Sequence, residues 1–234
     1  MKKGMLKYKI TTIRKATDGV KIFQMEPLEA KIAFKSGQFV MMSLLDKDGK
    51  VLDKRPYSIA CATDSPYLEF CIKIVGGKFT SELDKVKKGE IVGIDGPFGA
   101  MTYEGDKCAF ACGGTGIAPV ISMVRDIASK KLEGEYFVFY SVQYEKLLVH
   151  RKELEKIAKE NPNIKVIFTL TREAPKGWKG KCGHLNEAVF QESIKNPGEF
   201  NWYLCGPLAM TSALKECILK MGTDPKKVHM EGWG

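Results

Sequence analysis

The chain has 234 residues, of which 44% are hydrophobic and 28% charged, with 12 Phe, 8 Tyr and 3 Trp. This composition excludes a disordered chain, and the length favours two compact domains over a single one. The 37 Lys and Arg against 28 Asp and Glu give a net charge of +9, spread along the chain. A diffuse basic charge makes nucleic acid an unfavoured partner and suits an acidic protein or a polyphosphate cofactor.

The chain lacks the roughly 18 consecutive apolar residues of a membrane span and the apolar region of a secretory signal, so we expect a cytoplasmic protein without membrane insertion. Its seven cysteines are odd in number and lie mostly in apolar segments, which favours reduced thiols. Cys108 and Cys112 are spaced like metal ligands, but no second Cys or His pair follows, so we predict buried strand thiols and no metal site. Ordinary surface or capping roles are expected for the histidines, which are His150, His184 and His229.

Residues 6–98 are predicted to form short strands separated by turn residues, among them 20–25, 38–44 and 67–75. In the last of these, apolar residues alternate with Glu69, Cys71 and Lys73, which predicts a strand with one buried face. The pattern indicates an antiparallel barrel or sandwich.

The pattern changes after about residue 102. Apolar strands at 108–112, 136–140, 166–170 and 202–205 alternate with helical stretches, including one at helical spacing over 117–127 and one over 208–221. Strands separated by helices indicate parallel βαβ units and an open α/β sheet. We therefore predict two domains, residues 1–102 and 103–234.

The motif Cys112-Gly-Gly-Thr-Gly-Ile-Ala-Pro119 follows a predicted strand and opens a predicted helix. Glycines in this context let the backbone approach a pyrophosphate while the helix N-terminus supplies amide donors, so the motif predicts phosphate binding, with a tight turn as the alternative. Pro119 replaces the third glycine of the usual dinucleotide fingerprint, and no acidic residue ends the next strand. A generic Rossmann dehydrogenase is thereby disfavoured.

A second motif, Arg55-Pro-Tyr-Ser58, enters a strand of the first half. Together with the glycine-rich motif it resembles the ferredoxin–NADP reductase superfamily, and further matches at 76–83, 96–99 and 205–210 extend the resemblance over essentially the whole chain. The resemblance implies an N-terminal antiparallel β-barrel that binds FAD and a C-terminal α/β, Rossmann-like domain with a parallel sheet that binds NAD(P).

The resemblance also implies roles for FAD-binding residues. Arg55 is expected to neutralise the pyrophosphate, Tyr57 to pack on the isoalloxazine and Ser58 to lie near flavin N5, roles that suit a guanidinium fork and a flat aromatic ring. Without the resemblance, residues 76–83 read equally well as a loop with a capping threonine before a helix over 80–86. The implied FAD-binding set is Arg55, Pro56, Tyr57, Ser58, Ile72, Lys73, Ile74, Gly76, Gly77, Lys78, Thr80, Ser81 and Trp233.

On the nicotinamide side, the resemblance implies that Thr115 lies between the two cofactors and that Glu231 lies near the flavin, with Trp233 as a ring-covering aromatic. Without the resemblance, the apolar residues around Cys205 favour a buried thiol at the end of a strand. The implied nucleotide-binding set is Gly114, Thr115, Gly116, Pro119, Cys205, Gly206 and Pro207, and the implied catalytic set is Tyr57, Ser58, Cys205 and Glu231.

Two departures from the family bear on function. Gln143 stands where relatives that prefer NADP carry an arginine, which favours NADH, although Lys146, Arg151 and Arg172 offer charge nearby. No ferredoxin-like domain or iron–sulfur cysteine cluster follows Cys217, so we expect a separate electron acceptor, such as an acidic ferredoxin or a flavodoxin. The alternatives to such an NAD(P)H-dependent FAD reductase are a free-flavin reductase and an electron-transfer subunit of a larger dehydrogenase complex.

Overall fold

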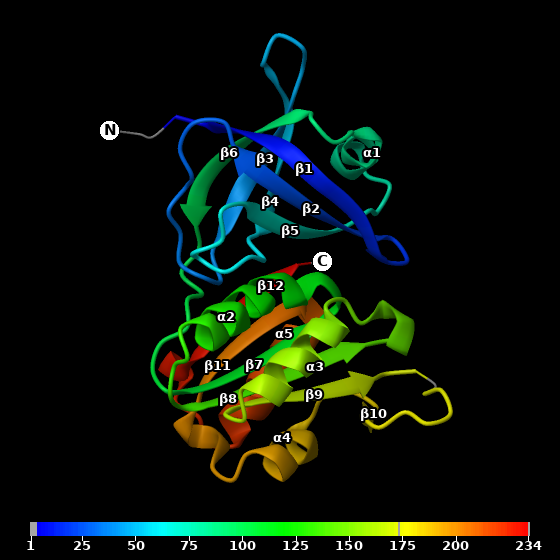
Figure 1. The fold of residues 1–234 in the computed structure, drawn as a ribbon. Coiled ribbons are helices and arrows are strands. Elements are labelled where there is room, and N and C mark those ends of the chain that lie inside the picture. Colours follow the sequence, from blue (N-terminus) through cyan, green and yellow to red (C-terminus); the bar gives the residue numbers. More distant parts are fainter. Residues whose placement is uncertain (1–3, 173, 234) are drawn as a thin grey trace.

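The computed structural model describes residues 4–172 and 174–233, so residues 1–3 and 234, at the outer ends of the predicted domains, lie outside it. Two sheets make up the molecule, one above the other along its long axis (Figure 1). The chain passes between them through residues 99–106, after the last strand of the first sheet and before the first strand of the second.

The first sheet is an antiparallel barrel. Its strands are β1 (Leu6–Thr17), β2 (Val20–Pro27), β3 (Phe39–Leu45), β4 (Val51–Ser58), β5 (Leu68–Lys73) and β6 (Ile91–Phe98), in the order β4-β3-β6-β1-β2-β5. A bridge between Ile59 and Phe70 joins the chain just after β4 to β5 and closes the barrel. Helix α1 (Lys78–Lys85) follows β5 and packs Phe79 and Leu83 into the barrel core.

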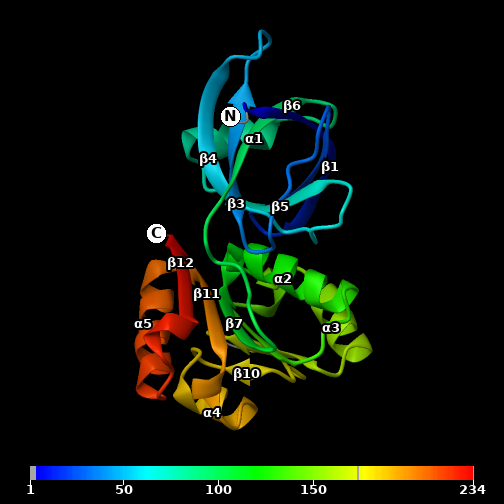
Figure 2. The same ribbon diagram turned by 90° about the vertical axis from the view of Figure 1, so that its left-hand side faces the viewer.

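The second sheet is parallel. Its strands are β7 (Lys107–Gly113), β8 (Glu135–Val142), β9 (Ile164–Leu170), β10 (Lys181–Cys182), β11 (Asn201–Pro207) and β12 (Val228–Trp233), in the order β10-β9-β8-β7-β11-β12. Helices α2 (Ile117–Ser129) and α3 (Arg151–Glu160) cover one face, and α4 (Glu187–Ser193) and α5 (Leu208–Lys220) cover the other (Figure 2).

The predicted fold class is confirmed: an antiparallel barrel precedes a parallel α/β sheet. Each strand predicted by its sequence pattern is present, with ends shifted by a few residues, and the predicted helices over 80–86 and 208–221 correspond to α1 and α5. Cys108 and Cys112 are buried in β7, as expected from their apolar neighbours.

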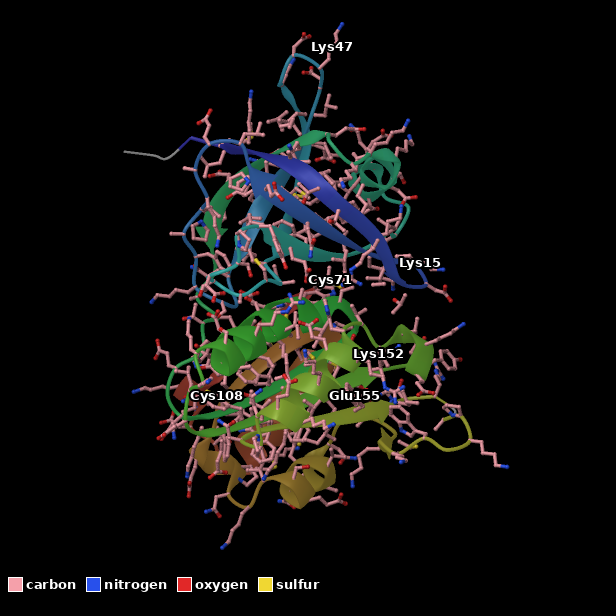
Figure 3. The ribbon with its side chains drawn as sticks, in the orientation of Figure 1. Lys15, Lys47, Cys71, Cys108, Lys152 and Glu155 are labelled. Atoms are coloured by element: carbon pink, nitrogen blue, oxygen red, sulfur yellow. The ribbon has the colours of Figure 1, made fainter. Side chains whose placement is uncertain are left out.

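The prediction for β5 was wrong in one respect. Alternation predicted one buried face, yet residues 68–72 are all buried. Leu68, Phe70 and Ile72 point into the barrel, whereas Cys71 belongs to the apolar core of the second domain. Figure 3 shows Cys71 at the junction between the two domains. The outer face of β5 is therefore covered by the other domain at Glu69 and Cys71, whereas Lys73 at its end is exposed.

The core of the second domain extends across this junction. It is formed by α2, α3 and one face of the parallel sheet, and it continues onto Val20, Ile22, Ala60 and Cys71 on the outside of the barrel. The two domains thus share buried apolar surface. None of the helices in the described residues is long and apolar enough to cross a membrane.

Candidate cofactor-binding site

A cavity of about 960 Å³ lies between the two domains. This volume is near the top of the range of about 300–1,000 Å³ that is usual for ligand pockets. Its walls come from β4, from the β5–α1 connection, from the start of α2, and from the carboxyl ends of β11 and β12. The lining residues are Phe39, Arg55, Pro56, Tyr57, Ser58, Cys71, Lys73, Val75, Gly77, Lys78, Phe79, Thr80, Thr115, Ala118, Pro207, Met230, Glu231, Gly232 and Trp233.

The end of β4 forms the first wall. Arg55 is half exposed there, and its Nη1 donates to the Asp53 carboxylate at 2.7 Å, which orients the guanidinium. The Tyr57 ring packs on Phe79 with ring centroids 5.7 Å apart. Burial raises the pKa of Tyr57 to about 12, so its hydroxyl stays protonated. This wall offers a cation, a flat aromatic face and, at Ser58, a hydroxyl.

The start of α1 forms the second wall. Gly77 occupies the N-cap position, and no side chain caps this helix end. The Thr80 hydroxyl donates to the Gly77 carbonyl at 3.2 Å and accepts from the Val75 amide at 3.4 Å, which fixes the turn. Thr80 therefore lies inside the helix and is not its cap. The uncapped amides, with Lys78 beside them, suit an anionic group.

The glycine-rich loop runs from the end of β7 through a short 3-10 turn, η1 (Gly114–Gly116), into α2. Thr115 and Ala118 face the cavity. Gly116 touches the backbone of β11 so closely that a Cβ there would lie 2.6 Å from the Cys205 carbonyl carbon and closer still to its oxygen. Only glycine fits at this crossing, which places the loop directly beside the end of β11.

Cys205 itself is completely buried, and its side chain is not part of the cavity wall. Burial raises the pKa of its thiol well above the usual value. Pro207, two residues later, does line the cavity. The Cys205–Pro207 segment thus meets the cavity through its end, while the thiol stays neutral behind it.

Strand β12 forms the last wall. It pairs in parallel with β11, so that Glu231 lies opposite Cys205 and Trp233 opposite Pro207. Burial raises the pKa of Glu231 above its ordinary value. Its carboxylate also approaches the first domain, because a Cβ added at Gly99 would lie 3.1 Å from its Oε1. Glu231 is thus a carboxyl group with raised proton affinity at the domain junction.

The cavity brings together most of the residues expected from the sequence. It collects Arg55, Pro56, Tyr57, Ser58, Lys73, Gly77, Lys78, Thr80, Thr115, Pro207, Glu231 and Trp233. The side chains of Ile72 and Ile74 instead pack into the barrel core. Expected residues that do not line the cavity are Gly76, Ser81, Gly114, Gly116, Pro119, Cys205 and Gly206.

Sequence reasoning missed several lining residues. Cys71 had a usable signal, since it lies on the same face of β5 as Lys73. Phe39 had none, because its place depends on the pairing of β3 with the end of β4, where it lies opposite Ser58. The other missed residues are Val75, Phe79, Ala118, Met230 and Gly232.

The loop after β8 starts with Gln143, which is exposed. The Arg151 guanidinium is bound by Glu145 and, at 2.8 Å, by Glu155. Lys146 reaches Asp18 on the β1–β2 hairpin at 3.5 Å. Two of the three cations near Gln143 therefore already have carboxylate partners, whereas the third, Arg172, is exposed and its amide donates to the Gln143 carbonyl at 3.2 Å.

The surface role expected for His150 was wrong. Its side chain is only 1% exposed, and its Nδ1 lies 2.9 Å from Oε2 of Glu153. It precedes α3 with a left-handed backbone, φ 59°, and does not cap the helix through its side chain. The reason is again the domain junction, because the buried Glu69 of β5 lies 3.9 Å from its Nε2. His184 is exposed, and His229 stacks on Tyr203 with ring centroids 4.9 Å apart.

Comparison with known proteins gives a consistent assignment. Residues 7–103 match the family described as oxidoreductase FAD-binding domain, and residues 110–216 match the oxidoreductase NAD-binding domain. Ferredoxin–NADP reductase B of Sorangium cellulosum is 28% identical over 235 residues, covering 95% of each chain. The chain belongs to the ferredoxin–NADP reductase superfamily. The resemblance noted from its motifs is thereby confirmed.

Other members of the superfamily align over most of the chain. The glycine betaine monooxygenase reductase subunit of Pseudomonas aeruginosa is 30% identical over 209 residues, and the alignment covers 86% of this chain but only 56% of that subunit. The FAD/NAD-binding domain of a Vibrio cholerae nitric oxide dioxygenase superposes with a TM-score of 0.87 at 19% identity, covering 98% of each chain. A ferredoxin NADP+ reductase from Neisseria gonorrhoeae, solved with bound FAD and NADP, gives 0.82 at 19% identity, covering 97% and 98%.

The residues that line the cavity suit FAD and a pyridine nucleotide. A basic fork, an aromatic face and an uncapped helix start line the barrel side of the cavity, which suits a flavin attached to a pyrophosphate. The glycine loop that touches β11 leaves room for a second phosphate-bearing group beside Thr115. Within residues 4–172 and 174–233, no group of three or more His, Cys, Asp or Glu is arranged to hold a metal ion.

Proposed function

We propose that the chain is a reductase that transfers hydride from NADH to FAD and passes the electrons to a separate acceptor protein. The observation that carries this proposal is the shared cavity, which is lined by Arg55, Tyr57 and Thr80 from the barrel and by Thr115 and the β11–β12 edge from the second domain. A site built from both domains suits two cofactors that must meet. Residues 1–102 are assigned to the FAD-binding domain and 103–234 to the nucleotide-binding domain.

On the FAD side, Arg55 and the α1 amides near Gly77, Lys78 and Thr80 hold the pyrophosphate. Tyr57 packs on the isoalloxazine ring, and Ser58 lies near its N5 atom. Ile72 and Ile74, whose side chains pack into the barrel core, contact FAD through their backbone. Bound FAD supplies the conversion between a two-electron hydride and single-electron steps.

On the nucleotide side, the Gly114–Gly116 loop holds the dinucleotide pyrophosphate, and Thr115 separates the two ring systems. Pro207 and the backbone of Cys205 and Gly206 set the position of the nicotinamide, since the buried thiol is turned away from the cavity. Trp233 covers the flavin ring. Glu231 holds or moves a proton beside it, a role that its raised pKa supports.

NADH is the proposed coenzyme. A 2′-phosphate needs a free cationic fork, and Gln143 offers none. Arg151 and Lys146, in the loop after β8, are bound by Glu145, Glu155 and Asp18. Arg172 is the remaining exposed cation beside Gln143, and a preference for NADPH would point to it. The ratio of kcat/KM for NADH to kcat/KM for NADPH tests this preference, and a ratio below one contradicts it.

The proposed acceptor is an acidic protein that carries an iron–sulfur centre or a flavin, such as a ferredoxin or flavodoxin. The net charge of +9 supports an acidic partner, because it steers association. The Pseudomonas aeruginosa relative is named a reductase subunit of a monooxygenase, which suggests an oxygenase component as a further acceptor. The seven free cysteines suit a reducing compartment, and we place the protein in the cytoplasm.

The test is an absorbance spectrum of the purified protein followed by anaerobic titration with NADH and, separately, with NADPH. We expect a retained flavin spectrum that NADH bleaches at low concentration, and then rapid reduction of an added ferredoxin. Loss of flavin on gel filtration indicates a free-flavin reductase instead. A colourless protein that consumes neither nucleotide refutes the proposal.

A further inference from the structure

Helix α2 presents a polar stripe to the barrel. Ser122, Arg125 and Asp126 are one turn apart or less, so they share one helix face, and Ser122 and Asp126 are fully buried. The Ser122 hydroxyl donates to the Cys61 carbonyl at 2.6 Å, and Arg125 Nη1 donates to the Ala60 carbonyl at 2.7 Å. Ser122 and Arg125 thus both contact the segment 60–63 that follows β4.

Asp126 completes this contact. Its carboxylate accepts from the Thr63 amide at 2.8 Å and from the Ser36 hydroxyl at 2.9 Å, both in the first domain. Lys130 donates to the same carboxylate from within α2 at 2.9 Å. Although burial opposes ionisation, these donors hold the pKa of Asp126 below its ordinary value. The stripe is therefore a satisfied charged contact between domains.

Arg125 also reaches the next strand of the barrel. Its Nη1 donates to Oε1 of Glu69 in β5 at 2.7 Å, and Glu69 is only 2% exposed. The other oxygen of Glu69 accepts from Gln24 at 2.9 Å. On its far side the guanidinium binds Glu153 of α3 through Nε at 2.6 Å and Nη2 at 2.9 Å. One planar side chain thereby joins α2, α3, β5 and the segment after β4.

The joined segments are the ones that form the cavity walls. Arg125 lies about two turns along α2 from Ala118, which lines the cavity. Glu69 precedes the lining residue Cys71 by two positions, and residue 60 follows Ser58 by two. A shift of Arg125 relative to Glu69 therefore changes the spacing between the two walls.

We propose that Arg125, through its buried pair with Glu69, is a positioning residue that sets the distance between the flavin wall and the nucleotide wall for hydride transfer. This inference rests on the proposed function. A buried ion pair contributes little net stability, because desolvation offsets its attraction, but its fixed fork specifies geometry. When both partners are replaced, the expected defect is thus in the rate of flavin reduction and not in folding, whereas removing one partner alone also lowers stability.

The experiment compares Glu69→Gln with a double variant, Arg125→Met with Glu69→Met, which keeps side-chain volume and removes both charges. The control is Glu199→Gln, which breaks the exposed pair of Glu199 with Lys107 inside the second domain, 2.5 Å apart, away from the junction. Flavin content, nucleotide dissociation constant and the rate of flavin reduction at saturating nucleotide are measured for each by anaerobic stopped flow.

We expect both junction variants to keep their flavin and bind nucleotide within about twofold of the parent, while flavin reduction slows at least about tenfold, since a misplacement near 1 Å costs up to about a hundredfold. Glu199→Gln reduces at the parental rate. Parental rates in the double variant overturn the proposal, because apolar packing then suffices. An equal loss in Glu199→Gln also overturns it.

A second readout needs no cofactor. Hydrogen exchange of protein prepared without flavin follows the Ala60 amide, which donates to the Glu69 carbonyl at 2.8 Å, and the Thr63 amide on Asp126. Both junction variants are expected to exchange faster in peptides covering 59–64 and 67–73, with other peptides unchanged. Unchanged exchange there contradicts the positioning role. If the parent protein fails to be reduced by any nucleotide, the proposed function fails, and this exchange result still decides whether the pair orders the junction.

Discussion

Replacing Gly116 by alanine tests whether the contact of the glycine-rich loop with β11 sets the site geometry. The added Cβ would lie 2.6 Å from the Cys205 carbonyl carbon and 3.0 Å from the Gly206 nitrogen, whereas ordinary contacts begin at 3.4 Å. The loop and β11 must therefore separate by at least about 0.8 Å, and both clashing partners are backbone, which cannot rotate away. Thr115, beside Gly116, moves with the loop.

The expected magnitudes follow from this displacement. Overpacking of this kind costs about 1–3 kcal/mol, or about 2–12 °C in Tm for a protein of this size. A shift near 1 Å between the reacting groups slows flavin reduction by about tenfold to a hundredfold. Anaerobic stopped flow measures the rate, and a thermal melt followed by circular dichroism measures the stability.

Gly134→Ala is the matched control. A Cβ at Gly134 would also meet backbone, 2.9 Å from the Asp106 carbonyl carbon, but at the amino-terminal ends of the parallel strands, where β8 begins. It is expected to lower Tm by at least as much, because Gly134 also has a positive φ of 137° that strains any side chain, and to leave the rate of flavin reduction unchanged. The reasoning fails if Gly116→Ala is reduced at the parental rate, or if Gly134→Ala loses rate equally.

Three further outcomes are expected. Arg55→Met weakens FAD binding by about tenfold to a hundredfold, because it removes a charge-assisted hydrogen bond to phosphate. Equilibrium dialysis measures the dissociation constant of FAD, and an unchanged value contradicts the role of Arg55 at the pyrophosphate. Glu231→Gln raises Tm at pH 7 but not below pH 4.5. Because burial raises the pKa of Glu231 in the folded state, its ionised form destabilises the fold only above the pKa of the unfolded chain, and thermal melts over a series of pH values check the sign. Burial alone would raise the pKa of Glu153, but His150 and Arg125 lower it to about 2. The ionised carboxylate therefore contributes stability that is complete above about pH 4.5 and is lost as the pH falls toward 2. Glu153→Gln is expected to flatten the fall in Tm over that window, and an equally steep fall in the variant argues against this role.

The sequence predicted the fold class and most of the cavity because these depend on local signals. Alternation along β5, the glycines before α2 and the Arg55–Ser58 motif are each readable within a few residues. Their chain order was enough to indicate a barrel followed by a parallel sheet, and the family resemblance that the motifs carry nominated twelve of the residues that line the cavity.

What the sequence did not predict depends on contacts between the domains. Glu69 and His150 look like surface residues by their type, yet their side chains are buried, because Arg125 and the outer face of β5 meet at the junction between the two domains. Phe39 lines the cavity through strand pairing, which no single-sequence pattern specifies. For Cys205, the residue types alone correctly favoured a buried strand-end thiol, and it was the family resemblance that placed this side chain in the catalytic set.

The fit between α2 and the barrel also limits how such domains can be exchanged. Stripe residues Ser122, Arg125 and Asp126 are complementary to segment 60–63 and Glu69, position by position. A chimera that takes its nucleotide-binding half from another reductase buries unpaired charges at this junction unless the complementary residues are transferred as well. The two surfaces therefore have to be exchanged together, although they lie in different domains and are separated in sequence by more than 50 residues.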